Sequence, residues 1–250
     1  MTDLLSSRHM LLDSIDNIRD LGGLETSDGR RTRSGLLFRS SMVHEISEQD
    51  AALLAQDLGV RLIMDLRSAG EIEQTGRGLL AAHIPAYINL PLFATDKKSV
   101  NLLPDDRLPT LALHYMGYLK KSSAQIAMAV RLLAHTAHLP VVFHCAAGKD
   151  RTGTLAAVVL SAIGVRDQEI IDDYALTNER LEYLLARMSR SEHYRHVVDT
   201  APAYTRGAHA ETMQQLLQHM QSELGGAEVW LKNIGVEEST LEQLRHSLLE

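Results

Sequence analysis

The sequence centres on His144-Cys-Ala-Ala-Gly-Lys-Asp-Arg-Thr-Gly153, a polar loop between two apolar segments. Before the loop, Pro140 introduces the compact run 141–144, which predicts a buried strand. After it, residues 152–163 predict a buried helix that ends at Gly164. A loop between a strand and a helix N-terminus can turn its backbone N–H groups inward and bind an anion. The order of strand, loop and helix therefore predicts a phosphate cradle.

Strands and helices alternate on the N-terminal side of this loop. Residues 36–40, 60–66 and 86–90 predict strands. A helix between the first two is indicated by Ser47 as N-cap and Gly59 at its end. We therefore predict an α/β fold with a central, mostly parallel sheet and helices on both faces.

The rest of the chain is predicted to be largely helical. Apolar residues keep helical spacing over 111–119, 126–134 and 213–224, and Ser239 with Glu242 matches a capping box. We expect two irregular segments, 91–109 as a surface excursion and 189–209 as a loop or mobile element. The C-terminal helices are predicted to add a helical extension.

Length and composition restrict the class of protein. With 250 residues and 45% hydrophobic residues, the chain is expected to form one domain, 1–250. The net charge of −7 argues against a nucleic-acid-binding surface. A single cysteine, the lack of a signal-peptide pattern and the lack of an apolar run of roughly 18 residues predict a soluble, cytoplasmic protein without a transmembrane segment.

Cys145 and Arg151 are the pair that suggests chemistry. Five residues separate them. An anion cradle favours a thiolate, which is the nucleophilic form of cysteine. The planar guanidinium of Arg151 can hold two phosphoryl oxygens at once. A lone cysteine is commonly just a small buried hydrophobe, but that alternative leaves the neighbouring loop residues unexplained.

The other loop residues fit the same prediction. Gly148 permits a tight backbone path, and Lys149 is expected to add positive charge at the rim. Thr152 is expected to donate its hydroxyl to the sulfur, and His144 to support the loop by hydrogen bonding. The predicted phosphate-binding residues are Ala146, Ala147, Gly148, Lys149, Asp150 and Arg151.

No metal or other cofactor is required by this chemistry. His193 and His196 are the nearest approach to a metal-ligand pair, but they lack further ligands at suitable spacing. We therefore expect these histidines to lie on a solvated surface or lid.

The loop resembles that of the bacterial tyrosine-protein phosphatase family, which has mycobacterial and listerial members. Four further segments resemble parts of that family in the same order: Asn17–Gly23, Gly35–Ser40, Asp65–Ser68 and Gly225–Leu231. The resemblance covers nearly the whole chain. It implies a fold of the tyrosine-phosphatase type and hydrolysis of phosphotyrosine, phosphoserine, phosphothreonine or phosphoinositides through a phosphocysteine. Some members cover the site with a helical lid, and the resemblance places such a lid over about residues 178–224.

A leaving alkoxide or phenoxide needs a proton donor, and two aspartates are candidates. The resemblance implies a catalytic role for Asp150 and for Asp65. A structural role is the alternative for each: Asp150 as a side chain that orients the loop, and Asp65 as a partner of Arg67 or Arg39.

Two polar residues, Arg19 and Asp20, precede the glycine pair at 22–23. The resemblance suggests that they lie at the mouth of the pocket. Capping of a turn is the alternative.

The expected partner is thus a phosphorylated protein, peptide or phosphoinositide. Two other functions keep parts of the pattern: a rhodanese-like sulfurtransferase, and a non-catalytic module that binds phosphoproteins or phosphoinositides. The Cys145–Arg151 pair favours phosphate-ester hydrolysis over both. The sequence leaves the oligomeric state open.

Overall fold

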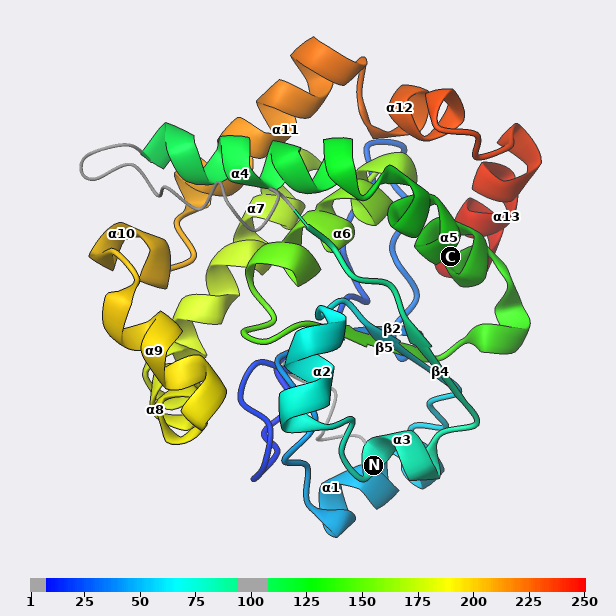
Figure 1. Cartoon of the computed structure of the whole chain (residues 1–250). Coiled ribbons are helices and arrows are strands. Elements are labelled where there is room, and N and C mark those ends of the chain that lie inside the picture. Colours follow the sequence, from blue (N-terminus) through cyan, green and yellow to red (C-terminus); the bar gives the residue numbers. More distant parts are fainter. Residues whose placement is uncertain (1–7, 94–107) are drawn as a thin grey trace.

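The computed structural model describes residues 8–93 and 108–250 and has a central five-stranded sheet (Figure 1). The strand order is β1-β2-β5-β3-β4. The strands are β1 (Arg19–Asp20), β2 (Leu37–Ser40), β3 (Leu62–Asp65), β4 (Ala86–Asn89) and β5 (Val141–His144). Only β1 runs antiparallel to its neighbour in this sheet. The predicted α/β fold with a mostly parallel sheet is confirmed.

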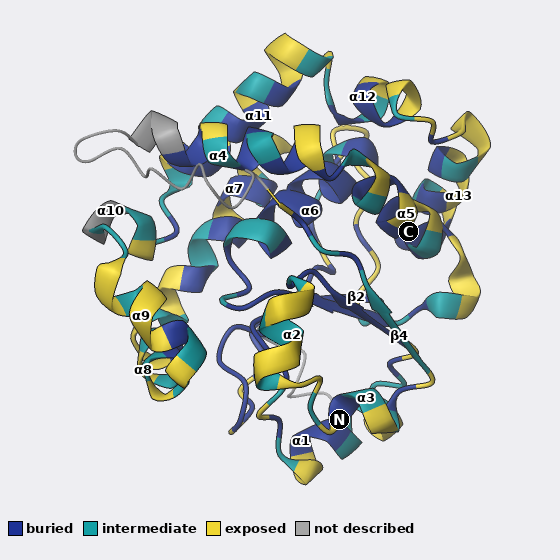
Figure 2. Ribbon diagram, viewed as in Figure 1, coloured by how far each residue is buried: buried dark blue, intermediate teal, exposed yellow. Residues whose placement is uncertain are grey.

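Successive residues of the central strands face two different cores, because side chains alternate across a sheet. In β5, Val141 and Phe143 join the larger core, whereas Val142 joins the smaller one. Met64 and Ile63 of β3 divide in the same way. The strands β2, β3 and β5 are therefore buried on both faces, whereas the edge strand β4 is only partly buried (Figure 2).

Helices cover the two faces unequally (Figure 1). The smaller core lies under α1 (Glu48–Ala52), the π-helical turn η1 (Leu53–Asp57) and α3 (Leu80–His83), together with residues 10–18. The larger core lies under the helices α4 (Leu108–Lys121), α5 (Ser123–Ala134), α6 (Asp150–Ala162), α7 (Asp167–Ala175), α11 (Ala210–Leu224), α12 (Ala227–Asn233) and α13 (Glu238–Leu248). The C-terminal helices thus belong to the main helical layer.

Six shorter elements complete the described chain. They are α2 (Ala69–Thr75), the 3₁₀ turns η2 (Thr136–His138) and η3 (Leu176–Arg180), α8 (Leu181–Arg190), α9 (Glu192–Thr200) and α10 (Ala203–Arg206). Met188 of α8 and Tyr194 of α9 pack against Ala146 in a small separate cluster beside the loop. Helices α8 and α9 therefore lie over the cysteine loop.

Two local predictions are wrong. Residues 189–209 are not an irregular loop, because they contain α9 and α10. Their apolar periodicity is weak because Tyr194 is the residue that α9 buries. The predicted capping box at Ser239 is absent, because Glu237 is the N-cap of α13 and the Ser239 hydroxyl bonds the Glu237 carboxylate instead. The surface excursion predicted for 91–109 falls mostly on residues 94–107, which lie outside the described residues.

No helix within residues 8–93 and 108–250 combines the length and apolarity needed to cross a bilayer.

A buried ion cluster ties β1, β2 and α7 together. The Asp173 carboxylate accepts hydrogen bonds from Arg19 Nε at 2.9 Å and from Arg39 Nη1 at 2.6 Å, and all three side chains are at most 1% exposed. Burial by itself raises the pKa of the Asp173 carboxyl, but the two guanidinium groups bring this pKa well below its usual range. The cluster therefore depends on an ionised Asp173.

We predict that Asp173→Asn lowers the free energy of unfolding by about 3–5 kcal/mol, because it leaves two buried guanidinium groups without their anion. Urea unfolding at pH 7 measures this loss. The neighbouring exposed Asp172→Asn is the matched control and is expected to change little.

The contribution of Asp173 depends on pH in a defined direction. Because its folded pKa is depressed, the stabilisation is complete above the pKa of an unfolded aspartate, about 3.9, and is lost as the pH falls towards the folded value. The gap in stability between wild type and Asp173→Asn is thus expected to narrow below about pH 4. A gap that stays constant down to pH 2 contradicts this account.

Candidate active site

Cys145 follows β5 at the carboxyl edge of the sheet. In register, His144 lies between Ser40 at the end of β2 and Asp65 at the end of β3. Cys145 is 2% exposed, and its Sγ accepts a hydrogen bond from the Gly148 N–H at 3.3 Å. The loop therefore curls around the sulfur.

Four carbonyl groups of the loop are fastened to donors outside it. The bonds are Leu66 N–H to His144 O at 2.8 Å, Met42 N–H to Ala146 O at 2.8 Å, Asn17 Nδ2 to Ala147 O at 3.0 Å and Arg39 Nη2 to Gly148 O at 2.7 Å. In a trans peptide the N–H points opposite to the C=O. Fastening the carbonyls outward therefore turns the following N–H groups towards the concave side, where an anion binds.

Two glycines in the loop are required by close approach. Gly148 has φ +69°, and a Cβ there would lie 2.5 Å from the Ser40 carbonyl oxygen. A Cβ on Gly153 would lie 3.0 Å from a ring carbon of Tyr174 and 3.3 Å from Arg39 Nη2. The first turn of α6 therefore fits against the buried cluster only without a side chain at Gly153.

The guanidinium of Arg151 forms a bidentate pair with Glu71, at 2.7 and 2.9 Å. Glu71 also belongs to a capping box with Ser68 at the start of α2, and it accepts a bond from the Tyr194 hydroxyl at 3.3 Å. Burial alone raises the pKa of the Glu71 carboxyl, but Arg151 and Ser68 lower it to about 2. Glu71 is therefore an anion that holds Arg151 beside the loop.

Asp150 is the first residue of α6 and lines the same pocket as Cys145. Its Oδ1 accepts a hydrogen bond from the Tyr115 hydroxyl and lies 3.2 Å from Lys149 Nζ. Burial raises the pKa of this carboxyl, but Lys149 and Tyr115 together bring it below its ordinary value. Its side chain is 29% exposed, so a substrate can reach it.

Asp65, the other predicted acid, is fully buried. Its carboxylate accepts several bonds from Arg67, including one of 2.7 Å, and one of 2.7 Å from the Tyr87 hydroxyl; His144 Nε2 lies 3.6 Å away. Burial raises the pKa of Asp65, and these neighbours lower it well below its usual range. This is the pairing with Arg67 given above as the structural alternative, and Asp65 does not line the cysteine pocket.

Two of three supporting residues differ from expectation. Lys149 is not at the rim: it is 4% exposed, and its ammonium bonds the carbonyl oxygens of Thr205 and Gly207 as well as approaching Asp150. The Thr152 hydroxyl is buried without a hydrogen-bond partner among the described residues, so the predicted bond to the sulfur is not formed here. His144 does support the loop, because its Nδ1–H donates to the Cys145 carbonyl at 3.2 Å.

Arg19 and Asp20 do not lie at the mouth of the pocket. Arg19 is fully buried in the Asp173 cluster, and it donates to the Oδ1 of Asn17, which in turn bonds the loop. Asp20 accepts bonds from the backbone N–H groups of Gly22 at 2.9 Å and Gly35 at 2.6 Å. Asp20 therefore caps the turn, which was the alternative role, because its carboxylate accepts hydrogen bonds from these backbone groups.

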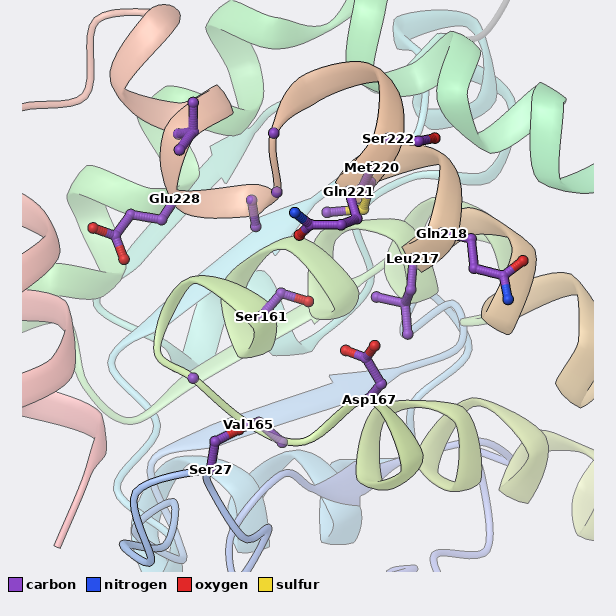
Figure 3. A pocket seen from close by; sticks show the side chains of 15 residues that line it. Ser27, Ser161, Val165, Asp167, Leu217, Gln218, Met220, Gln221, Ser222 and Glu228 are labelled. Carbon is purple, nitrogen blue, oxygen red and sulfur yellow. The ribbon is translucent and has the colours of Figure 1, made fainter.

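The pocket beside Cys145 encloses about 350 Å³. Its walls come from the loop, α2, α4, α8 and α9, and they include Glu71, Tyr118, Asp150, Arg151 and His193. A larger hollow of about 660 Å³ lies between α6, α7, α11 and α12 (Figure 3). The lining of that second hollow has no cysteine, histidine or basic residue. The cysteine pocket is therefore the candidate for chemistry.

Several site residues escaped the sequence analysis. Glu71 was detectable, because Ser68-x-x-Glu71 after a strand is a capping-box signal. His114, Tyr115 and Tyr194 gave no local signal, because helical packing alone brings them to the loop. His193 lines the pocket from α9. Among the described residues, no three histidine, cysteine or acidic side chains cluster as metal ligands.

Comparisons with known proteins agree over nearly the whole chain. A model described as "Tyrosine phosphatase family" matches residues 10–250. The "Tyrosine-protein phosphatase" of Nostoc commune is 31% identical over 212 residues, or 83% of this chain and 72% of the relative. The "Triple specificity protein phosphatase PtpB" of Mycobacterium tuberculosis is 28% identical over an alignment of 272 residues, which covers 93% of this chain and 96% of the relative. The solved structure of TpbA from P. aeruginosa is 16% identical, with a TM-score of 0.32 over 87% of this chain and 89% of that one.

We predict that Asn17→Ala weakens the binding of inorganic phosphate about tenfold, because the Ala147 carbonyl loses its donor and the adjoining N–H is no longer aimed inward. Isothermal titration calorimetry measures the affinity.

Asn89→Ala is the matched control for this prediction. It also removes a carboxamide that bonds two backbone carbonyls, those of Asp65 and Arg67, each at 2.8 Å, but neither belongs to the loop. Equal losses of affinity in the two variants would show that general destabilisation, rather than loop orientation, is responsible.

Proposed function

The chain belongs to the tyrosine phosphatase family and is a cysteine-dependent phosphatase, and from these premises we propose that it dephosphorylates phosphotyrosine in proteins through a phosphocysteine intermediate. The observation that carries the proposal is the loop itself: Cys145 lies within an anion cradle, four of whose carbonyls are bonded to donors outside it. A phosphoryl group with three peripheral oxygens is complementary to such a ring of N–H donors.

In the first step, the Cys145 thiolate attacks phosphorus, so that a P–S bond forms while the P–O bond to the substrate breaks. Arg151 and the loop N–H groups stabilise the charge on the phosphoryl oxygens. The leaving oxygen takes a proton, for which we propose Asp150 as donor, because it is the carboxyl group that lines the pocket and is not already paired with an arginine.

In the second step, water attacks the phosphocysteine. Asp150, now ionised, accepts a proton from the water; the P–S bond breaks, inorganic phosphate leaves and the thiolate is regenerated. Each step returns the proton that the other used, so no external acid or base is consumed.

Asp150 must carry a proton when the first step begins. In the free enzyme its lowered pKa makes the protonated form a minor one at neutral pH. A bound phosphate dianion places like charge beside the carboxylate and raises its pKa in the complex. Asp65 cannot gain a proton in this way, because Arg67 and Tyr87 already bond its carboxylate oxygens. We propose that Asp65 is structural and orients His144.

The proposed substrate range includes phosphoserine, phosphothreonine and phosphoinositides besides phosphotyrosine. The pocket is flanked by α8 and α9, and we propose that residues 181–206 form the lid predicted over 178–224. The remainder of that range, α11, packs against α4 and α7 in the main layer. The chain is proposed to act as one catalytic unit over 1–250, in the cytoplasm.

We predict that Cys145→Ser abolishes turnover of p-nitrophenyl phosphate, because serine lacks a thiolate, while inorganic phosphate still binds in the cradle. A colorimetric assay and calorimetry measure the two properties. Retained turnover contradicts the mechanism. A persulfide on wild-type Cys145 without phosphatase turnover would instead identify a sulfurtransferase, and binding without turnover a phosphate-recognition module.

We predict that Asp150→Asn slows hydrolysis of an alkyl phosphate by about 10²–10⁴-fold and that of p-nitrophenyl phosphate far less, because only the poor leaving group needs the proton. Steady-state kinetics on both esters measure the ratio. Equal losses on the two substrates would remove Asp150 from the role of acid and leave it as a residue that orients the loop.

A further inference from the structure

Two buried tyrosines from different helices converge on Asp150. The hydroxyl of Tyr115, on α4, lies 2.5 Å from Asp150 Oδ1, and the hydroxyl of Tyr174, on α7, lies 2.8 Å from that of Tyr115. Both side chains are fully buried. A phenol pair in the apolar core therefore ends on a carboxylate that lines the cysteine pocket.

The direction of the hydrogen bonds follows from the number of protons. An ionised carboxylate only accepts, so Tyr115 donates to Asp150, and its oxygen is left to accept from Tyr174. Burial holds the pKa of the Tyr115 phenol well above its ordinary value, so the donor stays protonated across the working pH range. The two hydrogen bonds therefore run in one direction: Tyr174 donates to Tyr115, and Tyr115 donates to Asp150.

The contacts of Asp150 distinguish its two oxygens. Both Tyr115 and Lys149 approach Oδ1. Within the described part of the chain, Oδ2 has no hydrogen-bond partner. The oxygen that remains to carry a proton to and from a ligand is therefore Oδ2.

We propose that Tyr115, backed by Tyr174, is a positioning residue for the reaction: it fixes Asp150 Oδ1 so that Oδ2 is aligned to transfer the proton in both steps. This inference rests on the proposed phosphatase function and specifies how its acid is held. Because Tyr115 is buried and separated from the substrate by Asp150, it acts through that carboxyl group.

Charged and titratable groups face Asp150 from three elements. They are Lys149, Cys145 and Arg151 of the loop, His114, Tyr115 and Tyr118 of α4, and Tyr174 of α7. Removing only the Tyr115 hydroxyl leaves the other groups and the burial in place. The ionised carboxylate then loses a donor, so Asp150 holds its proton to higher pH.

The test is Tyr115→Phe, which keeps the buried ring. We expect the basic limb of the kcat profile for an alkyl phosphate to move upward by about one pH unit, and kcat at its optimum to fall about tenfold because Oδ2 is less well aligned. KM is expected to change little. Tyr174→Phe is expected to move the limb in the same direction by a smaller amount.

Tyr87→Phe is the matched control, because it also removes a tyrosine hydroxyl from a buried aspartate, in that case Asp65. We expect it to leave the basic limb in place. A limb that moves in Tyr87→Phe but not in Tyr115→Phe would transfer the acid role to Asp65 and overturn the inference.

A merely structural Tyr115 would lower the melting temperature without moving either limb, and that result also overturns the inference. Failure of the proposed function itself looks different: wild type would then show no turnover, or Cys145→Ser would retain it, whatever the pH profile of Tyr115→Phe.

Discussion

The outward fastening of the loop carbonyls is the constraint on which the site depends. Arg39 makes the central connection, because one guanidinium bonds both the Gly148 carbonyl and the buried Asp173. A guanidinium has enough donors, in a fixed planar fork, to satisfy two acceptors at once. The geometry of a surface pocket is thus set by an ion cluster in the protein interior, where water does not compete for the hydrogen bonds.

This arrangement also explains why segments far apart in the sequence occur together. Asn17 and Arg19 come from the start of the chain, Arg39 from β2 and Asp173 from α7, yet they form one network with the loop. The two buried guanidinium groups share the Asp173 carboxylate, so removing that anion would leave both charges unpaired. The parallel sheet brings the members together, because its central strands end at the same edge as the cysteine.

The sequence allowed the strands, the loop and the Cys145–Arg151 pair to be predicted because each has a local signature: an apolar run, a glycine at a tight turn, a fixed spacing. It did not allow the partners of these residues to be predicted. Lys149 looked like a rim cation, but its burial depends on carbonyl groups near residue 206, some 56 positions along the chain. Residues 189–209 were misjudged for a similar reason, since α9 is stabilised mainly by one buried tyrosine placed over the loop.

Asp65 and Asp150 differ in their surroundings, and this difference is the basis of the different roles proposed for them. Each accepts a hydrogen bond from a tyrosine hydroxyl. Asp65 is the last residue of β3 and Asp150 the first residue of α6, both at the carboxyl edge of the sheet. Asp65 is also enclosed by a guanidinium, so its charge is permanent and its oxygens are occupied. Asp150 faces an ammonium that is shared with two backbone carbonyls, and one of its oxygens has no partner among the described residues. Since a catalytic acid must change its charge during turnover, it needs a partner that only partly compensates the carboxylate, and of the two aspartates Asp150 alone has that environment.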